Sequence, residues 1–190
     1  SVRSLCGLTE GQTTADFSGQ NLGPIDCKIM AAEYGFLGFI ATVDKVVLSG
    51  NSLLGNRDVQ SQEEYDKHGN TMPCDYGGFK SLCEALKPTS IKHLDLSRCR
   101  LDASATSSLA DAIKFMAALT SINCLANQFG EDDLATLLTA IEGTSVRSLC
   151  GLTEGQTVAD FSGKNLGPID CKIMAAEYEF QRFNAAVNSV

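Results

Sequence analysis

The chain contains 190 residues, of which 44% are hydrophobic, and its formal net charge is -8 at pH 7. This length accommodates one ordinary domain or a short array of repeats. The acidic balance disfavours nucleic acid and anionic membranes as partners, because both require a basic surface that displaces counterions. Charged residues interrupt even the most apolar window, so no segment reaches the ~18 apolar residues of a membrane-spanning helix.

The first unit of the chain recurs at its end. Near-identity at a spacing of 144 residues indicates a recent duplication, a tandem array or an assembled sequence, and a duplication without mechanical meaning is the alternative. Because the chain starts with Ser and shows no signal peptide, we expect a fragment or a processed chain. Residues 1–36 and 145–180 differ at three positions only, which are Thr14/Val158, Gln20/Lys164 and Gly35/Glu179.

Within the first unit, the segment ADFSGQNL predicts a short strand and a turn, with Phe17 and Leu22 directed inward. Gly23 and Pro24 then begin a helix, because proline suits the first helical turn. Apolar residues at helical spacing predict the buried face of this helix. They are Ile25, Ile29, Ala32 and Phe36.

A second predicted strand, at residues 43–53 (VDKVVLSGNSL), is followed by a polar insertion at residues 54–76. Long insertions into repeat proteins frequently have functions, although a solvated decoration is the alternative. The spacing of its acidic, histidine and cysteine side chains matches no zinc or calcium pattern, so we expect no metal site. These side chains are Glu63, Glu64, Asp66, His68, Cys74 and Asp75.

Strands and helices alternate from residue 79 to residue 141. The segments IKHLDLSRCRL (91–101) and LTSINCLANQF (119–129) predict strands. Three apolar stripes predict helices, the first ended by Pro88 and the third begun by the acidic residues 131–133. The stripes are Phe79, Leu82, Cys83 and Leu86, then Leu109, Ala112, Ile113 and Met116, then Leu134, Leu137, Leu138 and Ile141.

The second copy of the terminal unit breaks this alternation. The strand-like segments SVRSL (145–149) and TVADF (157–161) are separated by too few residues for a helical crossover, which needs about a dozen or more. Either the link GLTEGQ makes a hairpin-like excursion or one repeat lacks its helix, and the sequence leaves both open. The helix that follows repeats the first stripe as Ile169, Ile173, Ala176 and Phe180.

Five strand segments follow the pattern L-x-x-L-x-L-x-x-N/C-x-L, with weaker versions in the two terminal units. Combined with helices at a period of about 28 residues, this pattern resembles the ribonuclease-inhibitor-like class of leucine-rich repeats. The resemblance implies an α/β solenoid, a curved horseshoe segment with a parallel sheet on its concave face and helices on its convex face. We expect a single repeat domain of about five units over residues 1–190.

Two sets of side chains have predicted roles in this fold. The turn positions form a ladder that satisfies buried backbone groups, and the outward strand positions form a concave surface for a partner. The ladder consists of Gln20, Asn51, Cys99, Asn127 and Lys164. The concave surface consists of Asp16, Lys45, Val47, His93, Asp95, Ser121, Asn123 and Asp160.

The sequence shows no catalytic constellation. Only His68 and His93 are acid–base groups near neutral pH, and no phosphate-binding loop or metalloprotease motif is present. The eight cysteines include no CxxC pair, so we expect reduced thiols, with Cys83 and Cys124 in the core and Cys74 reactive. We therefore expect no enzyme activity and no cofactor.

These observations favour an interaction scaffold in the cytoplasm that holds a protein or peptide through the concave surface, the insertion or both. A structural solenoid that associates with itself through its ends, as a slice of a longer array, is the alternative, because neither end is a polar cap. A GTPase-activating regulator of the same repeat class is a further alternative, although no residue of the sequence indicates this function. Neither nucleic acid nor membrane is expected as a partner.

Overall fold

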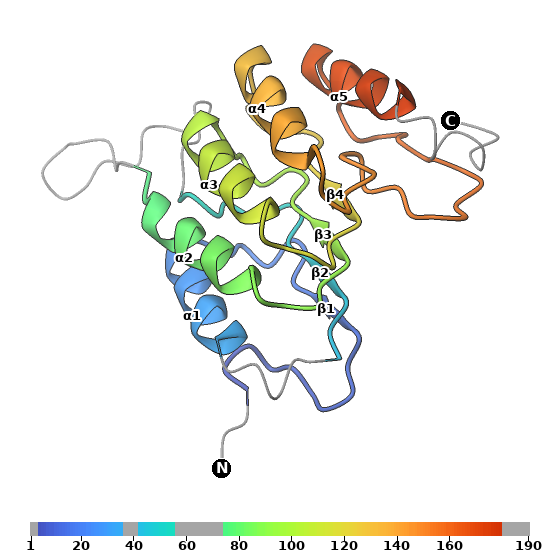
Figure 1. Ribbon diagram of the computed structural model, residues 1–190. Coiled ribbons are helices and arrows are strands. Elements are labelled where there is room, and N and C mark those ends of the chain that lie inside the picture. Colours follow the sequence, from blue (N-terminus) through green and yellow to red (C-terminus); the bar gives the residue numbers. More distant parts are fainter. Residues whose placement is uncertain (1–3, 36–41, 56–73, 180–190) are drawn as a thin grey trace, which may run out of the picture.

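The computed structural model describes residues 4–35, 42–55 and 74–179, in which short strands alternate with helices (Figure 1). Within these residues the strands are β1 (Thr14–Asp16), β2 (Lys45–Val47), β3 (His93–Asp95) and β4 (Ser121–Asn123). The helices are α1 (Pro24–Tyr34), α2 (Tyr76–Leu86), α3 (Ala103–Ile113), α4 (Glu131–Ile141) and α5 (Pro168–Glu179).

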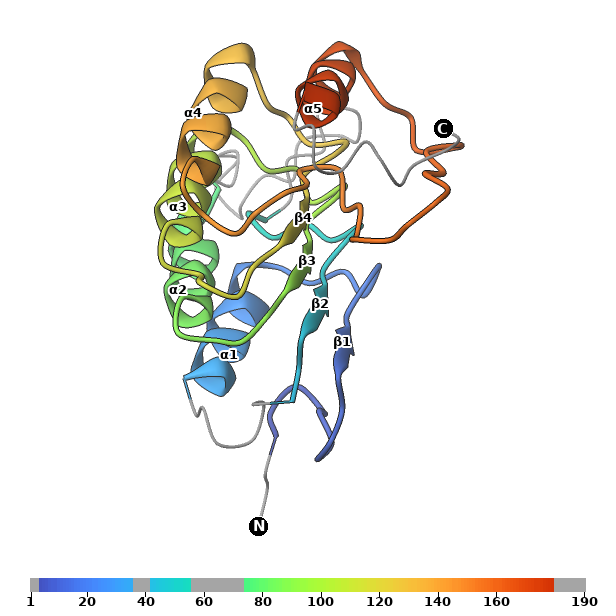
Figure 2. The same ribbon diagram turned by 45° about the vertical axis from the view of Figure 1, so that its right-hand side comes forward.

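The strands form one parallel sheet in chain order, and each strand pairs with the next in the same register. Helices α1 to α4 all lie on one side of this sheet (Figure 2). Because side chains alternate across a strand, only the central residue of each strand points toward these helices. These central residues, each at most 2% exposed, are Ala15, Val46, Leu94 and Ile122.

The predicted buried faces of the three central helices are confirmed. In α2 all four predicted residues are buried, and in α4 only Leu138 is less than fully covered. Met116 lies beyond the end of α3 but is also buried. The start and stop signals agree, because α2 ends at Leu86 before Pro88, and α4 begins at Glu131 with three acidic residues in its first turn.

The predicted buried face of α1 is wrong. Ile25 is 68% exposed and Ile29 is 40% exposed, whereas Cys27, Met30 and Tyr34 are buried on the other side of the helix. The stripe fails because α1 packs sideways against α2 and has no helix on its other flank within the described residues. Phe36 lies outside the described residues.

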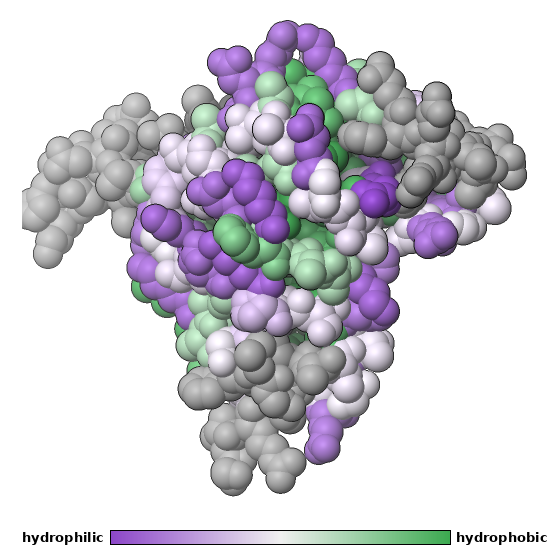
Figure 3. Space-filling model, in the orientation of Figure 1, coloured by the Kyte–Doolittle hydropathy of each residue, from purple (hydrophilic) through white to green (hydrophobic). Residues whose placement is uncertain are grey.

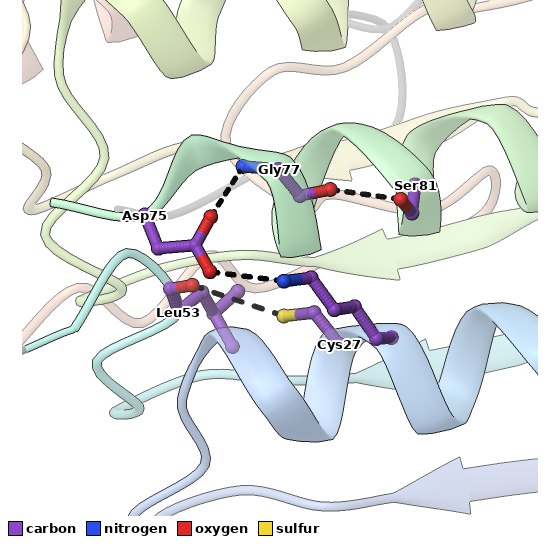
Figure 4. Close-up of polar contacts among 6 residues, drawn as sticks. Cys27, Leu53, Asp75, Gly77 and Ser81 are labelled. Atoms are coloured by element: carbon purple, nitrogen blue, oxygen red, sulfur yellow. Dashed lines mark hydrogen bonds and ion pairs between the residues drawn. The ribbon is translucent and has the colours of Figure 1, made fainter.

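The buried side of α1 contacts α2 at very short range. A Cβ on Gly78 would lie 2.1 Å from the carbonyl oxygen of Pro24, so only glycine allows this approach. Nearby, the thiol of Cys27 donates to the carbonyl of Leu53, and Asp75 caps α2 by accepting the N–H of Gly77 (Figure 4). The two helices therefore meet backbone to backbone at the start of α2.

Three of the five predicted ladder residues satisfy backbone groups of the preceding strand unit. The Asn51 amide donates to the carbonyl of Phe17 and accepts the N–H of Leu22. Asn127 likewise donates to Leu96 and accepts from Cys99 and Leu101. The Cys99 thiol donates to the carbonyl of Leu48 at 3.1 Å.

The two terminal positions of the ladder do not share this role. Gln20 is exposed and makes only a 3.4 Å contact with the carbonyl of Asp16, and the ammonium of Lys164 lies over the ring of Phe161. Gln20 and Lys164 each follow a glycine with positive φ, so both occupy the turn position predicted for them. Their side chains are long and lie at the exposed edge, where they point away from the interior.

The insertion predicted at residues 54–76 is shorter than expected at both ends. Leu54 is buried in the core, Asp75 is the N-cap of α2, and Tyr76 is its first residue. These three residues therefore pack in the core or begin a helix, although the polar composition of the segment predicted a loop. Of the other residues, only Gly55 and Cys74 are described, and Cys74, the thiol predicted to react, is partly buried against the core. The metal-ligating candidates Glu63, Glu64, Asp66 and His68 lie outside the described residues.

The link between the strand-like segments 145–149 and 157–161 makes a turn, and no helix lies between α4 and α5. Gln156 donates its N–H to the carbonyl of Thr153 at this turn, and Gln12 and Thr9 make the same turn in the first copy. The sequence left a hairpin-like excursion and a helix-less repeat open, and the structure shows a turn without a helix.

Candidate binding surface

The side of the sheet opposite the helices is open at β1, β2 and β3 (Figure 2). Parallel sheets are normally covered on both faces, so an uncovered parallel face is a feature that needs an explanation. Outward side chains of the first two strands are accessible: Thr14, Asp16 and Lys45 are exposed, and Val47 is half-buried. The structure thus groups three of the predicted concave-surface residues, Asp16, Lys45 and Val47, with two more on β3, His93 and Asp95.

Asp16 is one of two acidic groups at equivalent positions of this surface. Its carboxylate accepts the N–H of Ser18, and this hydrogen bond, followed by that of the Ser18 side chain, lowers the pKa of Asp16. Asp95 accepts from both the N–H and the hydroxyl of Ser97 in the same way. The two carboxylates are held in place by these turns, and Lys45 lies on the strand between them.

His93 lies next to Lys45 on the same face, and the structure places it where the sequence predicts. Burial is the main cause that lowers the pKa of His93, and Lys45 and Lys92 add to this effect while Asp44 opposes it. Its Nδ1 atom is buried and has no hydrogen-bond partner within the described part of the chain. Because the pKa lies below its ordinary value, the imidazole is neutral at pH 7.

Two predicted residues of the concave surface, Ser121 and Asn123, are instead buried, at 2% and 8% exposure. The segment that follows α4 covers them, because it pairs with β4 through bridges from Ser148 and Cys150. A Cβ on Gly151 would lie only 2.8 Å from the Cβ of Asn123. The prediction from strand alternation holds only where the next unit leaves this face of the sheet uncovered. Here the second copy of the duplicated segment covers it.

Asp160, the last predicted residue of the surface, lies outside the four named strands. It is exposed and accepts the N–H of Ser162, as Asp16 does for Ser18. The second copy therefore keeps the local turn. The sheet does not extend to Asp160, so this residue is not aligned with the other predicted residues of the surface. The open surface that we define here consists of Thr14, Asp16, Lys45, Val47, His93 and Asp95.

Sequence reasoning missed two buried glutamates, Glu33 and Glu177, that anchor the duplicated segments. Glu33 accepts the N–H groups of Leu5 and Cys6, and Glu177 accepts those of their counterparts, Leu149 and Cys150. Burial raises the pKa of Glu33, but hydrogen bonds from Ser4, Cys6 and Leu5 together lower it below its usual value. The signal was a glutamate that directly follows the apolar run at residues 29–32 and recurs in the second copy.

Other surface features of the molecule are weaker candidates for a functional site. A groove of about 400 Å³ between α3 and α4 is lined by small and polar side chains such as Ser107, Ala110 and Thr136. Hydrophilic residues cover much of the helical side in the view of Figure 3. Within residues 4–35, 42–55 and 74–179, no cluster of three His, Cys, Asp or Glu side chains could hold a metal ion.

Neither a protein-family model nor a curated protein matches this sequence. In the segments that the structure describes, no helix is long and apolar enough to cross a membrane. All eight cysteines are free thiols, and Cys83, Cys99 and Cys124 are buried as predicted. Burial is the main cause that raises the pKa of Cys99 to about 12.

Proposed function

We propose that the protein is a leucine-rich-repeat scaffold of the ribonuclease-inhibitor-like class that holds a protein or peptide partner on its open sheet surface. The observation on which this proposal depends is the uncovered face of β1, β2 and β3. A parallel sheet that exposes one face to water offers an extended, rigid surface for a partner, as in other solenoid proteins.

The repeat class is supported by contacts between successive strand units. Asn51, Cys99 and Asn127 each bind backbone groups of the unit before their own. Such a ladder is what the turn position of this repeat class is expected to supply. The in-register parallel strands and the helices on one side agree with the same class.

The charges of the open surface favour a partner segment that carries lysine or arginine. Asp16 and Asp95 are fixed by serine turns and flank a strand whose only charged outward group is Lys45. Fixed carboxylates bind guanidinium or ammonium groups without further ordering cost on the scaffold side. The half-buried Val47 lies between the two carboxylates and supplies apolar contact, and His93 lies beside Lys45.

A selection with a phage-displayed random peptide library tests this proposal. The immobilised chain is the target, and the double variant Asp16→Lys/Asp95→Lys is the counter-target. We expect enriched peptides to contain lysine or arginine and to bind the double variant at least roughly tenfold more weakly. The matched control is Asp111→Lys/Glu142→Lys on the helical side, which should leave binding unchanged. Peptides that bind both double variants equally would exclude the open surface as the binding site.

A further inference from the structure

The duplicated segment occurs twice in this chain, in two different surroundings. Among the described residues, the N-terminal unit (residues 4–35) packs against β2 and α2, which follow it, whereas the C-terminal unit (residues 148–179) packs against β4 and α4, which precede it (Figure 1). Each unit therefore shows what covers the side that the other unit leaves open.

We call the side toward a preceding unit the leading face. In the C-terminal unit it is covered: Leu149 is 1% exposed and Ile173 is fully buried. In the N-terminal unit the same positions are uncovered, with Leu5 at 62% and Ile29 at 40%. Together with Ile25, they are three of the five large hydrophobic residues that the described part of the chain exposes.

The opposite side, which we call the trailing face, shows the reverse. Cys27 is fully buried against α2 in the N-terminal unit, whereas its counterpart Cys171 is exposed. Met30 is buried, and its counterpart Met174 is only partly covered. The chain thus exposes one apolar leading face at one end and one apolar trailing face at the other.

Backbone groups repeat this asymmetry. The carbonyls of Ser148 and Leu149 accept the N–H groups of Ile122 and Cys124, and the N–H of Gly151 donates to Ile122. Within the described residues no backbone partner reaches the matching groups of Ser4, Leu5 and Gly7. On the trailing side, the N–H of Phe17 donates to Val47 in β2 and that of Gly19 to Ser49 just after β2. No described residue accepts the matching N–H groups of Phe161 and Gly163.

A groove at the leading face shows what shape would fill it. It measures about 190 Å³ and lies between Leu5, Phe17, Leu22 and Ile29, with Asp26 at its rim. In the C-terminal unit the turn after β4 approaches the matching place, and the N–H of Ala126 donates to Asp170 at 2.7 Å. No described N–H from another unit reaches Asp26, the counterpart of Asp170.

We propose that two copies of this chain associate head to tail, with the trailing face of one C-terminal unit covering the leading face of the next N-terminal unit. The turn of the C-terminal unit has the backbone of the turn after β4: Gly163 and Ala126 both have positive φ, 64° and 57°. Gly163 of one copy then takes the place of Ala126 and donates its N–H to Asp26 of the other. Unpaired strand edges and apolar faces are covered by the same contact.

The sequence differences between the two units agree with this arrangement. Thr14/Val158 and Gln20/Lys164 lie on the strand and turn, outside the helical surfaces that pack against neighbours. The helical residues of the two faces, Ile25, Cys27, Ile29 and Met30, are identical in the two copies, whereas Gln20, which lines the groove, is replaced by Lys164. A contact of this kind uses two different patches, so it propagates into open chains and does not stop at a symmetric dimer.

Sedimentation velocity on the full chain tests the proposal, with concentration as the variable. The wild type should form dimers and longer oligomers as concentration rises. Ile29→Glu on the leading face and Cys171→Glu on the trailing face should each weaken association roughly a hundredfold, because each buries an unpaired carboxylate in the contact. Both side chains are exposed in the single chain, so the melting temperature of each variant should stay close to that of the wild type.

A mixture of the two variants separates head-to-tail association from other modes. Ile29→Glu retains a sound trailing face and Cys171→Glu a sound leading face, so an equimolar mixture should form dimers and nothing larger. The control Phe115→Glu changes an exposed apolar residue outside both faces and should associate like the wild type. A wild type that stays monomeric, single variants that still associate, or a mixture that stays monomeric would each overturn the proposal.

Discussion

Cys27 and Cys171 occupy the same position in two nearly identical segments, yet the first is fully buried and the second is exposed. The difference is caused by their neighbours, because α2 covers Cys27 and no described helix follows α5. The same sequence therefore occurs in two different surroundings, and a residue in one copy can be compared directly with its counterpart in the other.

Brief alkylation of the native protein, diluted until it is monomeric, should modify Cys171 and spare Cys27. Burial is the main cause that raises the pKa of Cys27 to about 12, so its reactive thiolate is scarce as well as shielded. Trypsin separates the two sites, because Lys164 replaces Gln20 and shortens the second peptide. In denaturant both thiols should react alike, and equal labelling of the native chain would contradict the buried trailing face of the N-terminal unit.

Replacement of Asn51 by alanine should lower the free energy of unfolding by about 2–4 kcal/mol, because it leaves backbone groups of Phe17, Leu22 and Leu48 buried without partners. Urea denaturation measures this loss. The matched variant Gln20→Ala, at the exposed end of the ladder, should change stability by less than ~0.5 kcal/mol. Comparable losses at both positions would show that the ladder role extends to the end of the sheet.

Gly78→Ala should destabilise the protein by roughly 3 kcal/mol, although alanine is normally favoured over glycine in a helix by up to ~1 kcal/mol. The added Cβ would meet the Pro24 backbone and push α1 away from α2. Gly77→Ala, one residue earlier, would meet only the Asp75 side chain at 3.0 Å and should cost far less. Thermal melts of the two variants are sufficient, and a Gly78→Ala protein as stable as the wild type would exclude the close contact.

Acid should release the N-terminal segment from α1. Hydrogen bonds lower the pKa of Glu33 below its usual value, so its anionic form stabilises the folded state above the unfolded pKa of about 4.3, and this contribution is lost as pH falls through the lower folded pKa. The amide NMR signals of Leu5 and Cys6 should shift together in that range. In Glu33→Gln they should not titrate, and a shift that persists there would assign the transition to another group.

The sequence predicted the strands and central helices well because their apolar residues follow a fixed period and face one continuous core. Ala15 and Leu94 are buried where alternation requires it. It predicted α1 poorly because periodicity identifies an apolar stripe but does not show which stripe has a neighbour. Ile25 and Ile29 belong to a stripe whose counterpart is covered only in the second copy.

The candidate surface was predicted in part for a similar reason. Asp16 and Asp95 lie on the open face because a strand of known register fixes their direction. Ser121 and Asn123 follow the same rule, but residues 146–151 cover them, and the sequence left the course of that segment open. Cys171 was not singled out as the most accessible thiol, because accessibility depends on which unit follows.

Photo-crosslinking from the centre of the open surface shows directly whether a peptide binds on β1, β2 and β3. A photoreactive amino acid is placed at Val47 in one protein and at Phe115 in another, and each is irradiated with the tightest lysine- or arginine-containing peptide from the library selection. We expect a covalent adduct from Val47, located by mass spectrometry, and none from Phe115. An adduct from Phe115 alone, or none from Val47 under saturating peptide, would contradict a binding surface on β1, β2 and β3.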